Sequence, residues 1–205
     1  MILTREIIMI YTTAMLIDIY GKEYSNPKTK IGRLVKEGKF TPIIRGLYET
    51  DPNLDGKLLA DIIYNPSYLS FEYALSFHSL IPERVEAYTS ATVGKNRSKC
   101  YLTPFGRYTY RDVPESVFGT GIRYHIVGEY TFWMAVPEKA LCDMLYKLPR
   151  ITSLKAMECT LLDDMRIYED GLDDMSLDTI RKISDRYRNG NVSVFQRYME
   201  KRCRA

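Results

Sequence analysis

The sequence predicts an α+β protein, and three features of the chain indicate this class. Helical spacing and a short hairpin pattern come first, a period of two that is typical of strands follows, and helical spacing returns after residue 137. The chain has 205 residues, 45% of them hydrophobic and 27% charged, which is enough to bury a sizeable core. We expect an N-terminal domain over about residues 1–50 and a larger α+β domain over 51–205.

The N-terminal stretch is almost entirely apolar. Arg5 and Glu6 interrupt it, no small-residue cleavage site follows, and a membrane span needs about 20 uninterrupted apolar residues, so we expect neither a signal sequence nor a membrane segment. Thr4 is a candidate N-cap and Gly21 a candidate end, which predicts a helix from Thr4 to about Tyr20. Because this helix is apolar on nearly every side, it should pack against its own domain and against a following domain or a second subunit.

The segment after Ser25 carries the clearest helical signal. Asn26 and Pro27 have the order of an N-cap and a first helical position, and Gly38 follows the predicted end at about residue 37. At 100° per residue, the apolar residues Ile31, Leu34 and Val35 form one narrow stripe. The basic or polar residues on the other sides are Lys28, Thr29, Lys30, Arg33 and Lys36.

A basic hairpin is predicted directly after this helix, over residues 40–50. It turns at Arg45-Gly46, since glycine accepts a positive φ. A half-basic helix that leads into a basic hairpin is the arrangement of a winged helix-turn-helix. Only about six residues separate the first predicted helix from Pro27, so either the preceding helix of the motif is degenerate or the long first helix is divided.

The middle of the chain predicts two helices and then an antiparallel sheet of about five strands. The helices cover about residues 55–64 and 70–80, and Asn65-Pro66 separates them. Alternation begins after Pro82, and the two-residue turn Gly128-Glu129 predicts a hairpin. The hairpin strands are 122–127 and 130–136, and further turns are expected at 94–97 and 103–106.

The C-terminal part predicts helices that flank this sheet. One begins at Pro137 and ends near Leu148, one is capped by Ser176, and the last carries the capping box Ser193-x-x-Gln196. Eight acidic residues lie between 158 and 178, and the chain then becomes basic. The basic side chains of the last helix either pack near this acidic stretch or bind the DNA backbone: Arg197, Lys201, Arg202 and Arg204.

Several phrases between about Lys39 and Leu148 resemble, in their order and spacing, the AbiEi antitoxin family. They are Gly-Leu-Tyr at 46–48, Pro-Ser-Tyr-Leu-Ser-Phe-Glu-Tyr-Ala-Leu at 66–75, Leu-Ile-Pro-Glu at 80–83, Leu-Thr-Pro-Phe-Gly at 102–106, and Val-Pro-Glu-Lys-Ala-Leu-Cys-Asp-Met-Leu-Tyr at 136–146. The resemblance implies a cytoplasmic bacterial protein whose winged helix binds operator DNA and represses its own operon. It also implies a C-terminal domain that counters a nucleotidyltransferase-like toxin. In this family the opposition is usually classed as type IV, which requires no stable complex.

Two candidate surfaces follow from these patterns. The first is the DNA-binding set Lys28, Thr29, Lys30, Arg33, Lys36, Lys39 and Arg45, for which the alternative interpretation is a solvated helix face. The second is a basic surface for nucleic acid or toxin, for which the alternative is an ordinary exposed sheet face. It consists of Lys99, Arg107, Arg111 and Arg123. Tyr101, Tyr108 and Tyr110 are expected in the core and in cross-strand pairs.

Enzyme chemistry has little support in the sequence. His78 and His125 lack neighbouring acids or nucleophiles, and the four cysteines form no Cys-x-x-Cys pair, so we expect free thiols, no metal and no cofactor. A metal-dependent nuclease is the enzyme alternative, because 37–39 and 55–57 have the local form Asp/Glu-x-Lys. A third hypothesis keeps the fold as an interaction protein without DNA binding. The sequence leaves a monomer and a homodimer open.

Overall fold

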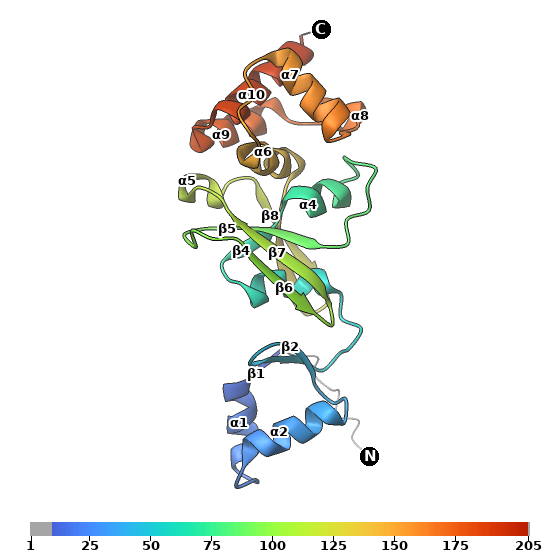
Figure 1. Ribbon diagram of the computed structural model, residues 1–205, viewed down its shortest axis with the longest axis vertical. Coiled ribbons are helices and arrows are strands. Elements are labelled where there is room, and N and C mark those ends of the chain that lie inside the picture. The colour runs from blue at the N-terminus through green and yellow to red at the C-terminus, as the bar shows by residue number, and fades with distance from the viewer. Residues whose placement is uncertain (1–9, 205) are drawn as a thin grey trace. The chain divides into compact units, whose positions relative to one another are not determined.

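The chain is a mixed α+β protein, seen here in a computed structural model that describes residues 10–204 (Figure 1). It divides into two compact units. Residues 1–56 and 101–107 form one, and residues 57–100 and 108–205 form the other.

The N-terminal unit contains two helices and a three-stranded sheet. Its elements are β1 (Tyr11–Thr12), α1 (Thr13–Gly21), α2 (Pro27–Lys36), β2 (Thr41–Ile44) and β3 (Leu47–Glu49). The strands have the order β1-β3-β2, and both pairings are antiparallel. The helices of this unit therefore precede a β-hairpin, as the sequence predicts.

The first predicted helix is wrong at residues 11 and 12. Tyr11 and Thr12 are extended and pair with Tyr48 and Leu47 of β3. Helix α1 begins only at Thr13, because the Thr12 side chain accepts a hydrogen bond of 3.1 Å from the backbone N–H of Met15. The predicted start at Thr4 lies outside the described residues. In the described residues, the strand β1 therefore precedes α1.

The second helix and the hairpin are confirmed. The Asn26 side chain accepts a hydrogen bond of 3.2 Å from the backbone N–H of Thr29, so it is the predicted N-cap. Between β2 and β3, Gly46 has φ +89°, a conformation that glycine adopts without the usual steric penalty. The backbone N–H of Thr13 donates a hydrogen bond of 2.9 Å to the Gly46 carbonyl and so ties this turn to α1.

A small core joins the two helices to the sheet of this unit. Its buried members are Leu16, Ile31, Leu34 and Phe40. Leu16 is the one buried residue of α1, while Met15 and Ile19 are exposed. The apolar character of α1 therefore exceeds what its own unit covers. The expected packing of this helix against a following domain or a second subunit stays a prediction.

A six-stranded sheet with the order β6-β7-β5-β4-β9-β8 is the base of the C-terminal unit, apart from residues 101–107 of its β6–β7 hairpin, which belong to the other unit. Its strands are β4 (Ser67–Leu69), β5 (Tyr88–Thr92), β6 (Lys99–Thr103), β7 (Gly106–Asp112), β8 (Ile122–Val127) and β9 (Tyr130–Ala135). The predicted hairpin is confirmed, since Val127 pairs with Tyr130 across the Gly128-Glu129 turn.

The predicted antiparallel arrangement is wrong, because the sheet is mixed. Strand β4 pairs with β9 in parallel, and β5 pairs with β7 in parallel. Two features produce this difference. First, residues 67–69, which precede the helix predicted at 70–80, form the buried strand β4, which the sequence pattern did not predict. Second, the β6–β7 hairpin places β7 rather than β6 beside β5.

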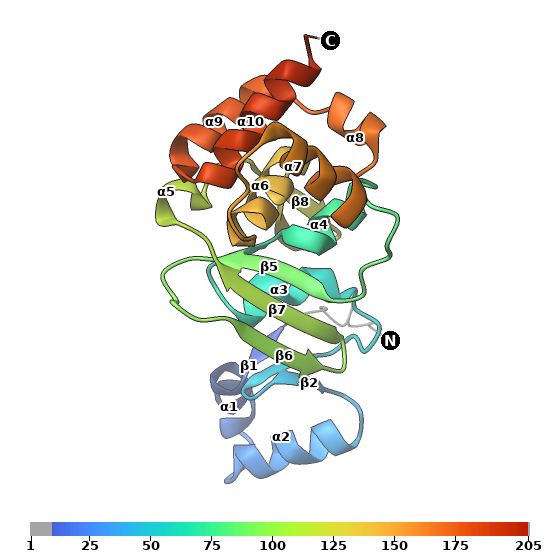
Figure 2. The same ribbon diagram turned by 45° about the horizontal axis from the view of Figure 1, so that its top comes forward.

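Helices cover this sheet and continue to the C-terminus. They are η1 (Gly56–Leu59), α3 (Ala60–Ile63), α4 (Phe71–Phe77), α5 (Glu115–Phe118), α6 (Pro137–Lys147), α7 (Leu154–Cys159), η2 (Thr160–Asp164), α8 (Glu169–Asp173), α9 (Leu177–Tyr187) and α10 (Gly190–Arg202). Figures 1 and 2 both show α6 between the sheet and the last helices, and α6 contacts α4, α9, α10 and β9. Helix α6 is therefore the central helix of this unit.

One of the two caps predicted for the last two helices is confirmed, and the other is wrong. Ser176 caps α9 as expected, since its Oγ accepts a hydrogen bond of 3.3 Å from the backbone N–H of Thr179. The predicted capping box at Ser193 is wrong. The Asn189 side chain caps α10 one turn earlier, and Ser193 lies within the helix, where its Oγ donates to the Asn189 carbonyl at 3.0 Å.

Candidate nucleic-acid interface

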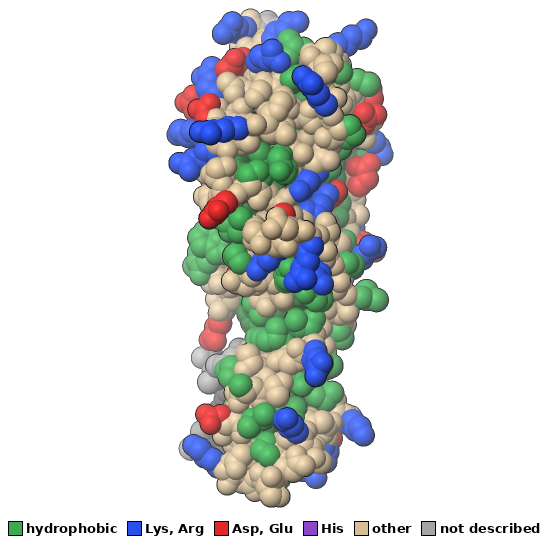
Figure 3. Space-filling view, turned by 60° about the vertical axis from the view of Figure 1, so that its left-hand side comes forward, with side chains coloured by type: hydrophobic (Ala, Val, Ile, Leu, Met, Phe, Trp, Pro, Cys, Tyr) green, Lys and Arg blue, Asp and Glu red, His purple; other side chains and the backbone are tan. Residues whose placement is uncertain are grey.

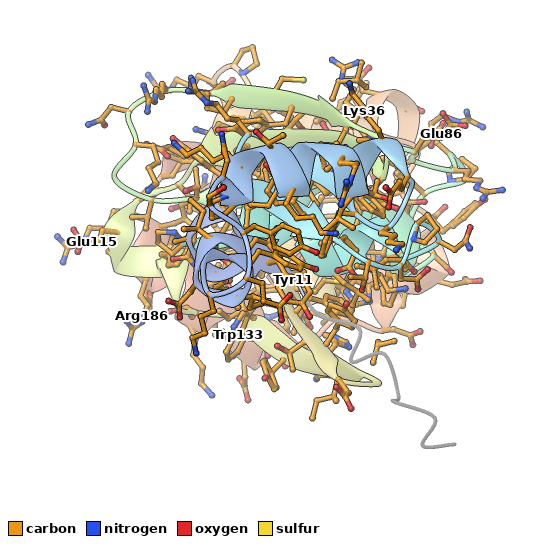
Figure 4. The ribbon with its side chains drawn as sticks, turned by 90° about the horizontal axis from the view of Figure 1, so that it is seen from below. Tyr11, Lys36, Glu86, Glu115, Trp133 and Arg186 are labelled. Atoms are coloured by element: carbon orange, nitrogen blue, oxygen red, sulfur yellow. The ribbon has the colours of Figure 1, made fainter. Side chains whose placement is uncertain are left out.

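Helix α2 separates its apolar side from its basic side. Ile31 and Leu34 are buried in the core of the N-terminal unit. Figure 4 shows Lys36 on the side of α2 that is turned away from Tyr11, which packs against that core. The exposed polar and basic residues of the helix are Lys28, Thr29, Arg33 and Lys36. The side that the sequence assigns to DNA is therefore free of the unit's own core.

Lys30 is the exception on this face, because it is half-buried. Its Nζ lies 4.7 Å from the centre of the Tyr24 ring, a cation–π contact. Beside this pair a hollow of about 190 Å³ lies along the first turns of α2, lined by Tyr24, Ser25, Asn26, Thr29, Lys30 and Arg33. A hollow bordered by the two cations Lys30 and Arg33 is chemically suited to an anionic or hydrogen-bonding group.

Glu37 partly neutralises the C-terminal end of the basic face. Its carboxylate lies 3.5 Å from the guanidinium of Arg33 and 3.7 Å from the ammonium of Lys39. All three side chains are more than 40% exposed, and exposed ion pairs of this kind are weak. Arg33 and Lys39 can therefore exchange Glu37 for another anion at little cost in free energy.

The hairpin adds two further cations to the N-terminal unit. Lys39 lies just before β2, and Arg45 lies in the turn between β2 and β3, and both are exposed. In Figure 3, Lys and Arg side chains project from the surface of this unit. Six of the seven residues predicted to bind DNA are thus exposed, and Lys30 contacts Tyr24.

The second predicted basic surface is not brought together. Lys99 and Arg107 lie on β6 and β7 at one edge of the sheet, whereas Arg123 lies on β8 at the opposite edge. Arg111 is engaged by neighbours: its guanidinium pairs with Glu72 and lies 3.8 Å from the centre of the Phe71 ring. Tyr108 and Tyr110 are fully buried, as the sequence predicts.

The basic end of the chain packs partly against the acidic stretch. Arg202 donates to Asp173 at 2.6 Å and to Glu169 at 3.1 Å, which joins α10 to α8. The hydrogen bond from Arg202 and its charge hold the pKa of Asp173 below its ordinary value. Of the two open alternatives, the packing one describes Arg202, while Arg197, Lys201 and Arg204 remain exposed.

Sequence reasoning missed a fully buried polar cluster around Asp143. The Asp143 carboxylate accepts hydrogen bonds from Lys139 Nζ at 2.6 Å and from Ser70 Oγ at 2.6 Å. Tyr68 donates to it at 3.0 Å, and the Tyr187 hydroxyl is a fourth donor. Burial, followed by the charge of Asp143, raises the pKa of both tyrosines well above the ordinary value.

This buried cluster ties three elements together. Tyr68 and Ser70 come from β4 and the residue after it, Lys139 and Asp143 from α6, and Tyr187 from α9. Lys139 and Asp143 are 0% exposed, so the other groups of the cluster must replace the interactions with water that each charge loses on burial. The signal in the sequence is a Lys and an Asp four residues apart on an otherwise apolar helix. Because solvent does not reach it, the cluster is suited to a structural role, which is to hold β4, α6 and α9 together.

The two histidines have structural partners. The His78 ring nitrogen Nε2 lies 2.9 Å from the Ala135 carbonyl, and His125 stacks on Phe132 with ring centroids 4.9 Å apart. Among residues 10–204 there is no group of three His, Cys, Asp or Glu side chains placed to hold a metal ion. Within the same range, no helix combines the length and the apolar character that crossing a membrane requires.

No protein-family model matches this chain, and no curated protein matches it significantly. The function must therefore be argued from the residues of the two units.

Proposed function

We propose that this protein is an antitoxin of the AbiEi type: a DNA-binding autorepressor that also counters a nucleotidyltransferase-like toxin. The observation that carries the DNA-binding part is the exposed basic face of α2, which continues into the exposed cations Lys39 and Arg45 of the hairpin. Phosphate contacts from such side chains position a protein on DNA, and the N-terminal half of a recognition helix reads base edges.

The order of elements in the N-terminal unit supports a winged helix-turn-helix. Helices α1 and α2 are joined by residues 22–26, and the β2–β3 hairpin follows in the position of a wing. In this proposal α1 (Thr13–Gly21) is itself the helix that precedes the recognition helix, so no further helix is needed between residue 21 and Pro27. Helix α2 is then the recognition helix, Lys28 and Thr29 in its N-terminal half face base edges, and Arg33, Lys36, Lys39 and Arg45 contact phosphates.

Titration with salt tests DNA binding. A gel shift of the protein on DNA from upstream of its own gene should give an affinity that falls as salt rises. Each neutralised phosphate contributes a slope of about −0.9 in log K against log salt. Binding that does not depend on salt, or no binding, would favour the alternative in which the fold serves only protein interaction. Uncut plasmid after incubation with Mg²⁺ would dispose of the nuclease alternative.

The antitoxin part of the proposal rests on the five phrases between residues 39 and 148. Two of these phrases, 66–75 and 136–146, supply elements of the C-terminal unit, and they contain the buried residues Tyr68, Ser70, Lys139 and Asp143. Co-expression with a nucleotidyltransferase-like gene from the neighbouring reading frame tests it. The full chain should restore growth, while a chain with both Arg33→Ala and Lys36→Ala should still restore growth and lose repression. Failure of the full chain to restore growth contradicts this part alone.

A further inference from the structure

We propose that strand β8 is the site at which two copies of this chain pair, edge to edge and antiparallel, about a two-fold axis at Ile126. Strand β8 is the last strand of the six-stranded sheet, so no described strand pairs with its outer side. This proposal does not depend on the proposed function, because it concerns residues of the C-terminal unit alone.

The backbone of β8 has hydrogen-bonding groups available on that side. Gly128 has φ +61° in the two-residue loop, as the first central residue of a type II′ turn requires, and Val127 pairs with Tyr130 across it. In such a hairpin the pair that flanks the loop exchanges backbone hydrogen bonds, and alternate residues direct their groups outward. The N–H and C=O groups of Ile126 and Tyr124 therefore point away from β9.

Exposed apolar side chains accompany this free edge. Ile126 is 70% exposed, Tyr124 50% and Trp133 40%. These three side chains lie on one face of the hairpin, because Tyr124 pairs with Trp133 and Ile126 pairs with Thr131. The rings of Tyr124 and Trp133 lie 4.8 Å apart, and Figure 4 labels Trp133. An exposed edge strand with large apolar side chains is a template for pairing with another strand.

The charges at the two ends of β8 select a second copy as the occupant. Arg123 lies near the start of the strand and Glu129 just after its end, both are exposed, and neither has an ion pair within the described chain. Antiparallel pairing centred on Ile126 brings Arg123 of each copy beside Glu129 of the other. Opposite charges across strands stabilise a pair, whereas like charges destabilise it. A parallel pairing would place like charges together.

The same register removes a steric conflict. Tyr124 of one copy lies opposite Gly128 of the other, which has no side chain and has nothing within 4 Å of the position of an added Cβ. Ile126 of one copy lies opposite Ile126 of the other, and the two exposed side chains bury each other. Each copy therefore offers the other an apolar centre between two pairs of opposite charges.

Oligomeric state tests this proposal on the full chain. Analytical ultracentrifugation across the micromolar range should show a concentration-dependent dimer for the wild type and a monomer for Ile126→Lys, since a lysine on an edge strand opposes pairing. The matched control is Leu102→Lys, at an 85% exposed position on the strand at the other edge. A wild type that stays monomeric, or an Ile126→Lys variant that still forms the dimer, overturns the proposal.

Charge reversal tests the register. Arg123→Glu alone and Glu129→Arg alone should each weaken the dimer by at least tenfold, and the double variant should restore it. An equimolar mixture of the two single variants should form a heterodimer, because each repelling end then meets an opposite charge. Independent, additive losses in the double variant would contradict the antiparallel register.

A disulfide tests the position of the two-fold axis. Directly opposed residues in a hydrogen-bonded pair have Cα atoms about 5.5 Å apart, which a disulfide spans. With the exposed cysteines Cys100, Cys159 and Cys203 changed to Ser, Ile126→Cys should therefore cross-link two chains under oxidation. Tyr124→Cys is the control, since four residues of offset separate its two copies by about 14 Å. Cross-linking of Tyr124→Cys with none from Ile126→Cys would overturn the register.

Discussion

The Asn26 side chain fixes the start of the helix that carries the proposed DNA contacts. Its amide oxygen accepts from the Thr29 backbone N–H, and Pro27 supplies the first helical position. If α2 began at another residue, Lys28 and Thr29 would change position relative to the rest of the helix. A single local hydrogen bond thus positions the part of α2 nearest to the bases in the proposal.

Replacing this cap should destabilise the N-terminal unit. Asn26→Ala removes the acceptor, and the loss of such a cap costs about 1 kcal/mol. Asn26→Asp keeps an acceptor at the same place and should stay close to the wild type, because a negative charge at a helix N-terminus is favourable. Urea unfolding followed by circular dichroism measures both variants. Equal stabilities for Asn26→Ala and Asn26→Asp would show that the hydrogen bond does not cap α2.

Lys139 should be the most sensitive single residue in the C-terminal unit. Lys139→Met leaves the Asp143 carboxylate buried without its counter-ion, and breaking a buried pair in this way costs about 3–5 kcal/mol. The double variant Lys139→Met with Asp143→Asn removes both charges and keeps an oxygen for the three hydroxyl donors. It should recover part of the loss in free energy of unfolding. A Lys139→Met variant as stable as the wild type would contradict the account of this cluster.

At the scale of elements, sequence signals predicted what is fixed locally. Asn26-Pro27, Gly46, Gly128-Glu129 and Ser176 are caps and turns, and each directs the backbone through its own side chain or its lack of one. The elements that were missed depend on distant partners. Strand β1 exists because Tyr11 and Thr12 pair with β3, and β4 because Ser67–Leu69 lies between β5 and β9. Local propensity carries no information about such pairings.

The link between α8 and α10 should weaken in acid. The hydrogen bond from Arg202 lowers the pKa of Asp173, so Asp173 binds a proton less readily in the folded than in the unfolded chain. Its stabilising contribution is present above the ordinary aspartate pKa of about 3.9 and is lost as the pH falls through the lowered value. Asp173→Asn should be less stable than the wild type at neutral pH and equally stable in strong acid.

Urea midpoints measured from neutral pH into strong acid test this sign. Asp174→Asn is the matched control, because it removes the same charge from an exposed neighbour that has no ion pair among the described residues. If the difference in urea midpoint between wild type and Asp173→Asn grew in acid, the pKa of Asp173 would be raised on folding and not lowered.

At the scale of the whole molecule, the sequence predicted residues on a single helix better than residues from several elements. The α2 face follows from a period of 3.6 within ten residues, and the structure keeps it exposed. The second basic surface required the order of strands. Because β5, β4 and β9 lie between β7 and β8, Arg123 is far from Lys99 and Arg107. The buried cluster at Asp143 likewise needed the meeting of β4, α6 and α9.

The central proposal is that the basic face of α2, together with the hairpin cations Lys39 and Arg45, binds operator DNA, and that no other basic surface of the described residues does. The matched comparison is Arg33→Ala with Lys36→Ala against Arg197→Ala with Lys201→Ala, since both remove two exposed cations from one helix. Their affinities for DNA from upstream of the gene are measured across a salt series. The α2 variant should lose at least tenfold in affinity and lower the magnitude of the salt slope by about 1.8, at about 0.9 for each phosphate contact. The α10 variant should match the wild type, and equal losses in the two variants would contradict the claim.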